Sequence, residues 1–155
     1  MKKLALGLAA VAFLAGCASV KMEPKEVSDK AKQFAPPAAG MAGVYVYRDS
    51  FVGKALKKDV WIDGKCIGES GPDVFFYTEA TPGKHTLSTE SEFSPNDLAI
   101  MLEAGKNYFY RQFIKMGLVK GGADLEAVPE AEAKRPIAKL ELASVSSAST
   151  ARSSN

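Results

Sequence analysis

Histidine and cysteine are scarce in this sequence: its 155 residues include one His and two Cys. Zinc sites are commonly built from several His or Cys side chains, so this count excludes a zinc site of that kind, and no metal or cofactor is expected. Long hydrophobic runs are missing too. The longest, residues 4–14, falls well short of the roughly 20 apolar residues that a membrane-spanning helix needs. The sequence therefore predicts no transmembrane helix.

The N-terminus carries an export signal. Lys2 and Lys3 precede the apolar run, which ends in Leu14-Ala15-Gly16-Cys17. A charged start, a short apolar segment and small residues before a cleavage point are typical of a secretory signal peptide. The last four residues resemble the lipobox of bacterial lipoproteins. The resemblance implies that residues 1–16 are removed and that Cys17 carries acyl chains such as palmitate. An ordinary secretory signal with Cys17 near the cut is the alternative.

Charge gives no reason to expect a nucleic-acid partner. The formal net charge of +2 comes from Lys2 and Lys3. The 139 residues that follow the leader, 17–155, carry 18 basic and 18 acidic side chains and so have no net charge. These form no basic cluster, whereas nucleic-acid-binding domains carry a positive face. A chain of 139 residues has the size of one domain with its own core.

Cysteine chemistry depends on Cys17. If Cys17 carries the lipid, Cys66 has no second cysteine in the chain with which to form a disulfide. We then expect Cys66 to be a small apolar residue of the packing. An intermolecular disulfide and a catalytic thiol are the alternatives.

Composition divides the chain after the leader into three parts. Residues 17–42, rich in Lys, Glu, Ala and Pro, are predicted to form the lipidated Cys and a flexible tether. A flexible chain of this length spans roughly 25–30 Å, and a helical turn or two between Glu23 and Phe34 is compatible with it. Residues 43–142 are predicted to form the folded domain. Residues 143–155, almost all Ser, Ala and Thr, are predicted to be a disordered tail.

Strand signals recur through the folded part, separated by turn residues such as Asp63-Gly64 and Pro82-Gly83. No long amphipathic helix alternates with them. This pattern predicts an all-β protein, a small antiparallel β-sandwich of about seven strands. Pro129 and the acids after it favour a short C-terminal helix, interrupted at Pro136. The expected strands are 44–48, the two arms of a 59–68 hairpin, 74–77, 84–90, 97–103, 107–115 and 123–128.

Alternation within these strands predicts which side chains share a face. Around the Asp63-Gly64 turn, Val60, Ile62 and Ile67 fall on one face, and Trp61 and Cys66 fall on the other. Leu98, Ile100 and Leu102 also share a face and are expected in the core.

The order of these motifs resembles a known family. It comprises Val44-Tyr-Val-Tyr-Arg48, Val60-Trp-Ile-Asp-Gly64 with Gly68, Pro82 to Leu87, and Glu103 to Tyr108 with Arg111. It is similar to the bacterial lipoprotein domain of unknown function 2846, over roughly residues 40–142. The middle part also resembles PEGA-type β-repeats of surface proteins. Both resemblances imply a small immunoglobulin-like or transthyretin-like sandwich, and they bring no catalytic residues and no ligand.

Catalysis has little support. His85 with Ser88 or Ser91 and Asp97 would supply the residue types of a hydrolase triad, but no Gly-x-Ser-x-Gly elbow and no oxyanion-hole segment accompanies them. His85 is therefore expected to be a half-exposed structural residue. Asp59 and Asp63 flank Trp61, an arrangement that would suit sugar binding or glycosidase chemistry. The turn already explains the presence of Asp63, so this interpretation is weak.

Three side chains form a candidate contact surface: Trp61, Arg48 and Arg111. Trp61 is expected either to pack on a second layer or to be exposed. Each Arg closes an aromatic run, and an Arg in an apolar strand must pair with an acid or emerge at an edge. A structural ion pair with Glu79, Glu103 or Asp73 is one interpretation. A cationic rim that binds an anionic group or a partner is the other.

The sequence favours a non-enzymatic, lipid-anchored protein of the Gram-negative envelope. It would act as a binding or structural module that faces the periplasm and contacts an unknown envelope protein or glycan. A hydrolase acting on envelope sugar or peptide is the alternative. In enteric-type lipoproteins, Asp directly after the lipidated Cys retains the protein in the inner membrane. Here that position is Ala18, so the resemblance implies the outer membrane.

Overall fold

The computed structural model describes residues 20–119 and 121–146. The predicted leader (1–16), the lipidation site Cys17 and the end of the predicted tail lie outside the described residues. The elements in chain order are α1 (Lys25–Ala31), β1 (Ala42–Arg48), β2 (Lys58–Ile62), β3 (Lys65–Ser70), β4 (Val74–Ala80), β5 (Gly83–Thr89), β6 (Asn96–Leu102), β7 (Asn107–Lys115), β8 (Gly122–Val128), α2 (Glu130–Ile137) and β9 (Glu141–Leu142).

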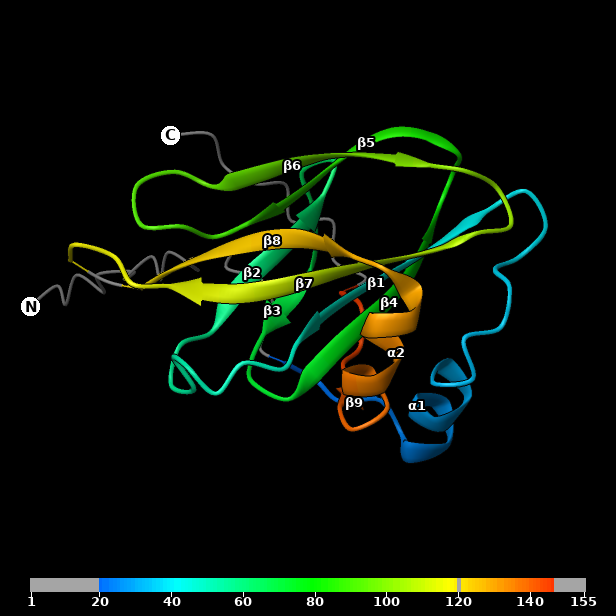
Figure 1. The fold of residues 1–155 in the computed structure, drawn as a ribbon, viewed down its shortest axis with the longest axis horizontal. Coiled ribbons are helices and arrows are strands. Elements are labelled where there is room, and N and C mark those ends of the chain that lie inside the picture. The colour runs from blue at the N-terminus through cyan, green and yellow to red at the C-terminus, as the bar shows by residue number, and fades with distance from the viewer. Residues whose placement is uncertain (1–19, 120, 147–155) are drawn as a thin grey trace, which may run out of the picture.

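The strands form two sheets that face each other, which confirms the predicted β-sandwich (Figure 1). The four-stranded sheet has the order β3-β2-β5-β6 and is wholly antiparallel. The five-stranded sheet has the order β8-β7-β1-β4-β9 and contains two parallel pairs, β1 with β7 and β4 with β9. Sequence alternation alone does not reveal this, because strand direction depends on which distant strands become neighbours.

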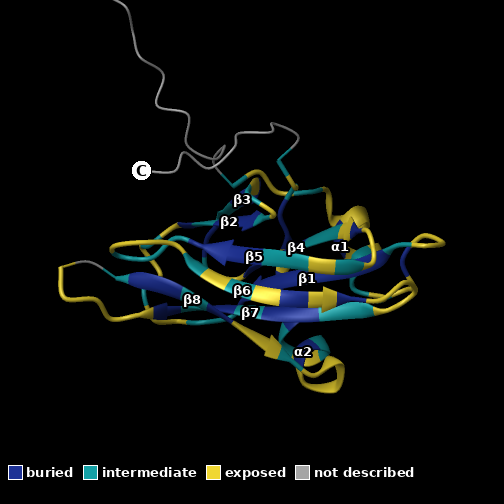
Figure 2. Cartoon of the chain, turned by 90° about the horizontal axis from the view of Figure 1, so that it is seen from above, coloured by how far each residue is buried: buried dark blue, intermediate teal, exposed yellow. Residues whose placement is uncertain are grey.

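The main hydrophobic core fills the space between the two sheets. Val60 and Ile67 lie in it and Ile62 packs against it, so the predicted faces of the β2–β3 hairpin are confirmed. Ile100 and Leu102 are buried in the same core. Figure 2 shows the buried segments of the strands between exposed loops at the two ends of the sandwich.

A second hydrophobic cluster covers the outer face of the five-stranded sheet. Tyr45 and Tyr47 of β1 and Phe109 of β7 point away from the main core and pack under Ile137 of α2 and Leu140. Phe34, which follows α1, adds another aromatic ring, with its centroid 5.4 Å from that of Tyr45. Because β1 is buried on both faces, the domain has three layers: the four-stranded sheet, the five-stranded sheet and the helices.

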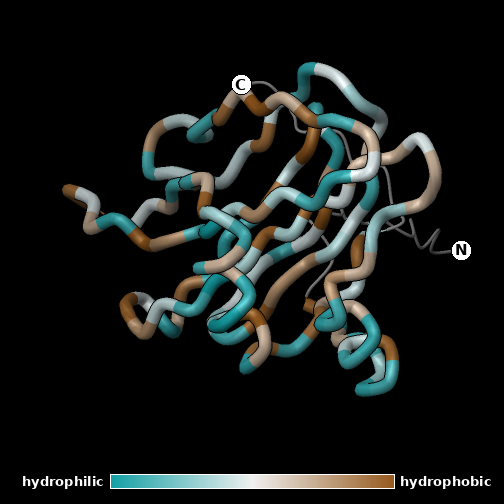
Figure 3. The backbone as a smooth tube through the Cα atoms, turned by 45° about the vertical axis from the view of Figure 1, so that its right-hand side comes forward, coloured by the Kyte–Doolittle hydropathy of each residue, from teal (hydrophilic) through white to brown (hydrophobic). Residues whose placement is uncertain are grey.

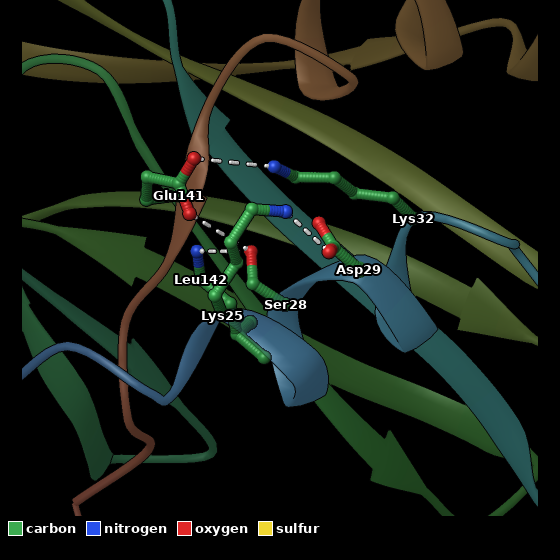
Figure 4. A network of polar contacts seen from close by, with 6 residues as sticks. All are labelled: Lys25, Ser28, Asp29, Lys32, Glu141 and Leu142. Carbon is green, nitrogen blue, oxygen red and sulfur yellow. Dashed lines mark hydrogen bonds and ion pairs between the residues drawn. The ribbon is translucent and has the colours of Figure 1, made fainter.

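The prediction that residues 17–42 form a flexible tether is wrong from residue 20 onward. Val20 packs against the main core, and α1 is fixed to the C-terminal strand through Ser28, which accepts the Leu142 N–H at 3.1 Å and donates to Glu141 (Figure 4). Lys32 adds an ion pair to Glu141 at 3.4 Å. The physical reason is that the aromatic outer face of β1 and β7 would otherwise be exposed to water. A few small apolar residues such as Ala31 are enough to dock there.

The predicted C-terminal elements are partly confirmed. Helix α2 forms, and Pro136 stands in its last turn, one residue before the helix ends at Ile137. The chain beyond Leu142 departs from the predicted tail up to residue 146. Ala143 is buried and pairs with Met22, and the Ser146 N–H donates to the Ile67 carbonyl. Within the described ranges, no helix combines the length and apolarity that crossing a bilayer requires.

The two ends of the sandwich differ. At one, which we call the turn end, the strands are joined by short turns at residues 63–64, 81–82 and 103–106. At the other, the loop end, longer loops cover residues 49–57 (β1–β2), 90–95 (β5–β6) and 116–121 (β7–β8). Backbone and side-chain contacts between these loops hold them together.

Candidate contact surface

Arg48 is not at the surface, so the alternative in which it belongs to a cationic rim is wrong. Its side chain is fully buried. The guanidinium donates to the carbonyls of Gly53 and Leu56, both at 2.6 Å. Burial lowers the pKa of Arg48 below its ordinary value, and the charge of Asp73 opposes this shift. Arg48 therefore acts from inside the domain by holding the 49–57 loop in a fixed shape.

Arg111 forms a structural ion pair. Its Nε donates to Asp49 at 2.7 Å, and a terminal nitrogen lies 3.4 Å from Glu126. The hydrogen bond with Asp49 raises the pKa of Arg111. The ion-pair interpretation thus describes its contacts, although the acids are not those expected from sequence.

Trp61 is also a buried side chain, with 8% of its surface exposed. It lies on the face of β2 opposite the main core, across from Cys66 on β3 and Ser88 on β5. A side chain with so little exposure offers almost no area to a partner. The interpretation of Trp61 as a contact residue is therefore wrong for this conformation, and packing is its role.

Cys66 is buried and takes part in a disulfide bond. The expectation of a thiol without a partner is therefore wrong. The sequence contains one other cysteine, Cys17, which lies outside the described residues. Among the residues that the structure describes, no group of three or more His, Cys, Asp or Glu side chains is arranged to hold a metal ion.

His85 is engaged at the turn end rather than in a triad. Its Nδ1 lies 2.6 Å from Asp63 and its Nε2 lies 2.7 Å from the Thr81 carbonyl. Both partners are acceptors, so this geometry favours the doubly protonated ring. The hydrogen bond to Asp63 raises the pKa of His85. With both nitrogens used in this way, His85 is not placed to take a proton from Ser88 or Ser91.

Sequence reasoning missed the most exposed apolar surface of the described chain, which lies at the loop end. Six large apolar side chains there have between 52% and 93% of their area exposed. They are Phe51 and Val52 in the first loop, Phe93 in the second, and Met116, Leu118 and Val119 in the third. We call these six residues the apolar tip. Figure 3 shows apolar residues at the extremities of the loops, where the chain turns back.

The loops that carry the apolar tip are fixed by polar contacts. The carboxylate of Glu92 accepts the backbone N–H of Leu118, at 2.8 Å, and that of Val119. The Asn96 amide donates to the Ala123 carbonyl at 2.6 Å, and the Ala123 N–H donates to the Glu90 carbonyl. The Glu92 bonds tie the second loop to the third, and the bonds of Ala123 tie the start of β8 to the second loop and to β6. Because the backbone polar groups are satisfied inward, the apolar side chains are held outward.

The first loop is fixed as firmly. Arg48 binds it from below, and Gly53 lies against Ile114 of β7. Gly53 has a φ of +68°, and a Cβ there would stand 2.9 Å from an Ile114 carbon, so only glycine fits without strain. Lys54 lies over the Phe51 ring at 4.3 Å. The apolar tip is thus a built feature of the fold.

Comparison with known proteins gives a family without an activity. The family model described as "Protein of unknown function (DUF2846)" matches residues 38–123. The chain belongs to this family. The DUF2846 match begins before β1 and ends at the start of β8, so it includes all three loops of the loop end.

A curated relative of this DUF2846 protein is an "Uncharacterized protein" of Haemophilus influenzae. It is 57% identical over 131 residues, which cover 84% of this chain and 78% of the relative. No solved structure matches the chain significantly. The resemblance of the middle part to PEGA-type repeats stays a prediction.

Proposed function

We propose that this protein is a lipid-anchored, non-enzymatic module of the bacterial envelope, held by acyl chains on Cys17 and contacting its surroundings through the loop end. The observation that carries the contact surface is the apolar tip, which three separate loops hold outward. Contiguous exposed apolar patches on soluble domains mark interaction sites. The anchor itself rests on the Leu14–Cys17 motif and the apolar run before it.

The described fold supports a close connection between anchor and domain. The chain is packed from Val20 onward, so only two residues separate Cys17 from the folded domain. The protein then lies next to its membrane rather than at the end of a long tether. For the hydrolase alternative, the contacts of His85 offer no support.

The anchor is tested by metabolic labelling with a fatty-acid probe. The wild type should be labelled and Cys17→Ser should not. One sulfur cannot carry both a thioether and a disulfide, so the proposal requires that Cys66 is not bonded to Cys17 in the lipidated protein. Cys66→Ala is therefore the matched control and should keep the label. If Cys17→Ser retains both label and membrane association, the anchor proposal is wrong. A wild type that carries no label would overturn it equally.

We place the anchor in the outer membrane, with the domain facing the periplasm. This rests on Ala18. In enteric-type lipoproteins, Asp at that position keeps the protein in the inner membrane, and here the residue is Ala. Separation of the two membranes on a sucrose gradient tests it. Wild type should appear in the outer fraction and Ala18→Asp should move to the inner one. Wild type in the inner fraction would contradict the placement.

A further inference from the structure

We infer that the component which the loop end contacts is the membrane itself: the apolar tip inserts into the headgroup region of a bilayer that contains anionic phospholipid. The inference rests on the proposed function, because it names the partner of the same surface. It is argued from the shape, the charge and the position of the loop end.

The shape of the apolar tip suits a soft apolar phase. Met116, Leu118, Val119, Phe51 and Phe93 each have more than three quarters of their surface exposed. Side chains so exposed project into solvent from three separate loops of the sandwich. Loop and helix residues of this kind, with Leu and Phe beside Lys, enter the boundary between headgroups and acyl chains.

The charge of the loop end suits anionic headgroups. Its three acids are all engaged within the domain: Asp49 with Arg111, Glu90 with Lys58, and Glu92 with the backbone of the third loop. The cation Lys54 lies on the Phe51 ring at the surface. Lys57, half exposed, stands in the same loop and contacts Glu69 at 3.6 Å. Two of the three acids are paired with cations, and the exposed lysines Lys54 and Lys57 stand beside apolar side chains, a combination that attracts anionic lipid.

The proposed anchor keeps the whole domain, and with it the loop end, close to the bilayer. Three Cα–Cα steps separate Cys17 from Val20, which is a reach of about 11 Å at most. A domain held at this distance meets the headgroups continually, so even a weak affinity of the loop end acts at high effective concentration. A protein partner would have to displace this contact.

The test uses the mature chain, residues 17–155, with Cys17→Ser so that no acyl chain contributes. All residues of the described fold are present in it. We expect this protein to sediment with vesicles of phosphatidylcholine containing phosphatidylglycerol. The triple variant Phe93→Ser, Leu118→Ser, Val119→Ser should bind about tenfold or more weakly, because each buried methylene contributes about 0.8 kcal/mol. Lys54→Glu should weaken binding to the anionic vesicles and leave binding to pure phosphatidylcholine unchanged.

The matched control is Met101→Ser with Val27→Ser. These residues are exposed and apolar but lie on β6 and α1, away from the loop end. The control should bind vesicles like the parent, and all variants should keep the parent's urea unfolding midpoint. Equal binding by the triple variant and the parent would overturn the inference.

Two further outcomes separate this inference from the anchor proposal. If the fatty-acid label is found on Cys17 but the unlipidated chain binds no vesicle, the anchor stands and the docking is wrong. If the label is absent but the unlipidated chain binds vesicles through the apolar tip, the docking stands and the anchor is wrong. Self-association in sedimentation velocity that the triple variant abolishes, without vesicle binding, would assign the surface to a second copy and overturn the inference.

Discussion

The turn end and the loop end of the sandwich solve the same problem, reversal of the chain, in different ways. At the turn end, Asp63 and Gly64 both have positive φ, +48° and +75°, as a tight hairpin turn requires. The chain reverses within two residues and leaves little room for projecting side chains. At the loop end, the 49–57 loop needs Arg48, buried in β1, to hold its carbonyls.

This difference explains where a contact surface can develop. A tight turn is specified by its own residues and offers few positions for variation. A longer loop held by distant side chains can present large residues outward without losing its shape. The apolar tip depends on that arrangement, since Glu92 of one loop binds the backbone of another. Four predictions test the comparison, from the largest expected effect to the smallest.

Arg48→Ala should have the largest effect on stability. It removes two charge-assisted hydrogen bonds to partly buried carbonyls, each worth about 1.5–3 kcal/mol, so a loss of about 3 kcal/mol in the free energy of unfolding is expected. Arg48→Lys should lose an intermediate amount, because one ammonium group does not reach both carbonyls as a fork does. Urea unfolding measures both. A loss below about 1 kcal/mol for Arg48→Ala would show that the loop holds itself without Arg48.

Two glycine substitutions compare the ends directly. Gly64→Ala at the turn end has open space around the new Cβ and should cost about 1 kcal/mol for the positive φ alone. Gly53→Ala at the loop end meets Ile114 as well and should cost about 2 kcal/mol. The difference between the two unfolding free energies is the quantity of interest. Equal losses would remove the argument that tertiary packing shapes the first loop.

The His85–Asp63 pair should give the turn end a pH dependence. The pKa of His85 is raised by its hydrogen bond to Asp63, so its stabilisation is fully present below 6.5, the ordinary His value, and is lost as pH rises through the folded pKa. Burial tends to raise the pKa of Asp63, but hydrogen bonds from His85 and the Thr86 N–H outweigh it and lower that pKa. The contribution of Asp63 is therefore present above 3.8 and lost as pH falls through its folded value.

Urea midpoints of wild type and His85→Gln measured from pH 5 to 9 test this. The wild type should lose stability above pH 6.5 and His85→Gln should give a flatter curve. Parallel curves for the two proteins would mean that the pair does not control this part of the pH profile.

Leu118→Ser should have the smallest effect on stability. The side chain is 93% exposed, so unfolding in urea should change by no more than about 0.5 kcal/mol. The same substitution should weaken vesicle binding, which separates the contact role of the apolar tip from a folding role. A loss above about 1 kcal/mol would show that Leu118 packs in solution and is not available to a membrane.

The turns and strand faces could be predicted from sequence because they depend on neighbours in the chain. Asp63-Gly64 specifies a hairpin, and period-2 alternation places Ile100 and Leu102 in the core. The position of residues 20–42 could not be predicted in the same way. Their apolar residues are few, and only the aromatic face of β1 and β7 gives Ala31 and Phe34 something to cover. Arg48 was misplaced for a related reason, since its burial depends on a loop that folds back over it.

The sequence by itself determined a β-sandwich, its tight turns, the faces of its hairpin and an N-terminus typical of export and lipidation. These features are local in the chain, so residue order alone specifies them. Only the tertiary structure decided that β1 and β7 run parallel, that α1 docks on the sheet and that three loops meet at one end. Phe51, Phe93 and Leu118 lie far apart in the sequence, with no period between them. They become one surface because strands far apart in sequence end at the same edge of the sandwich.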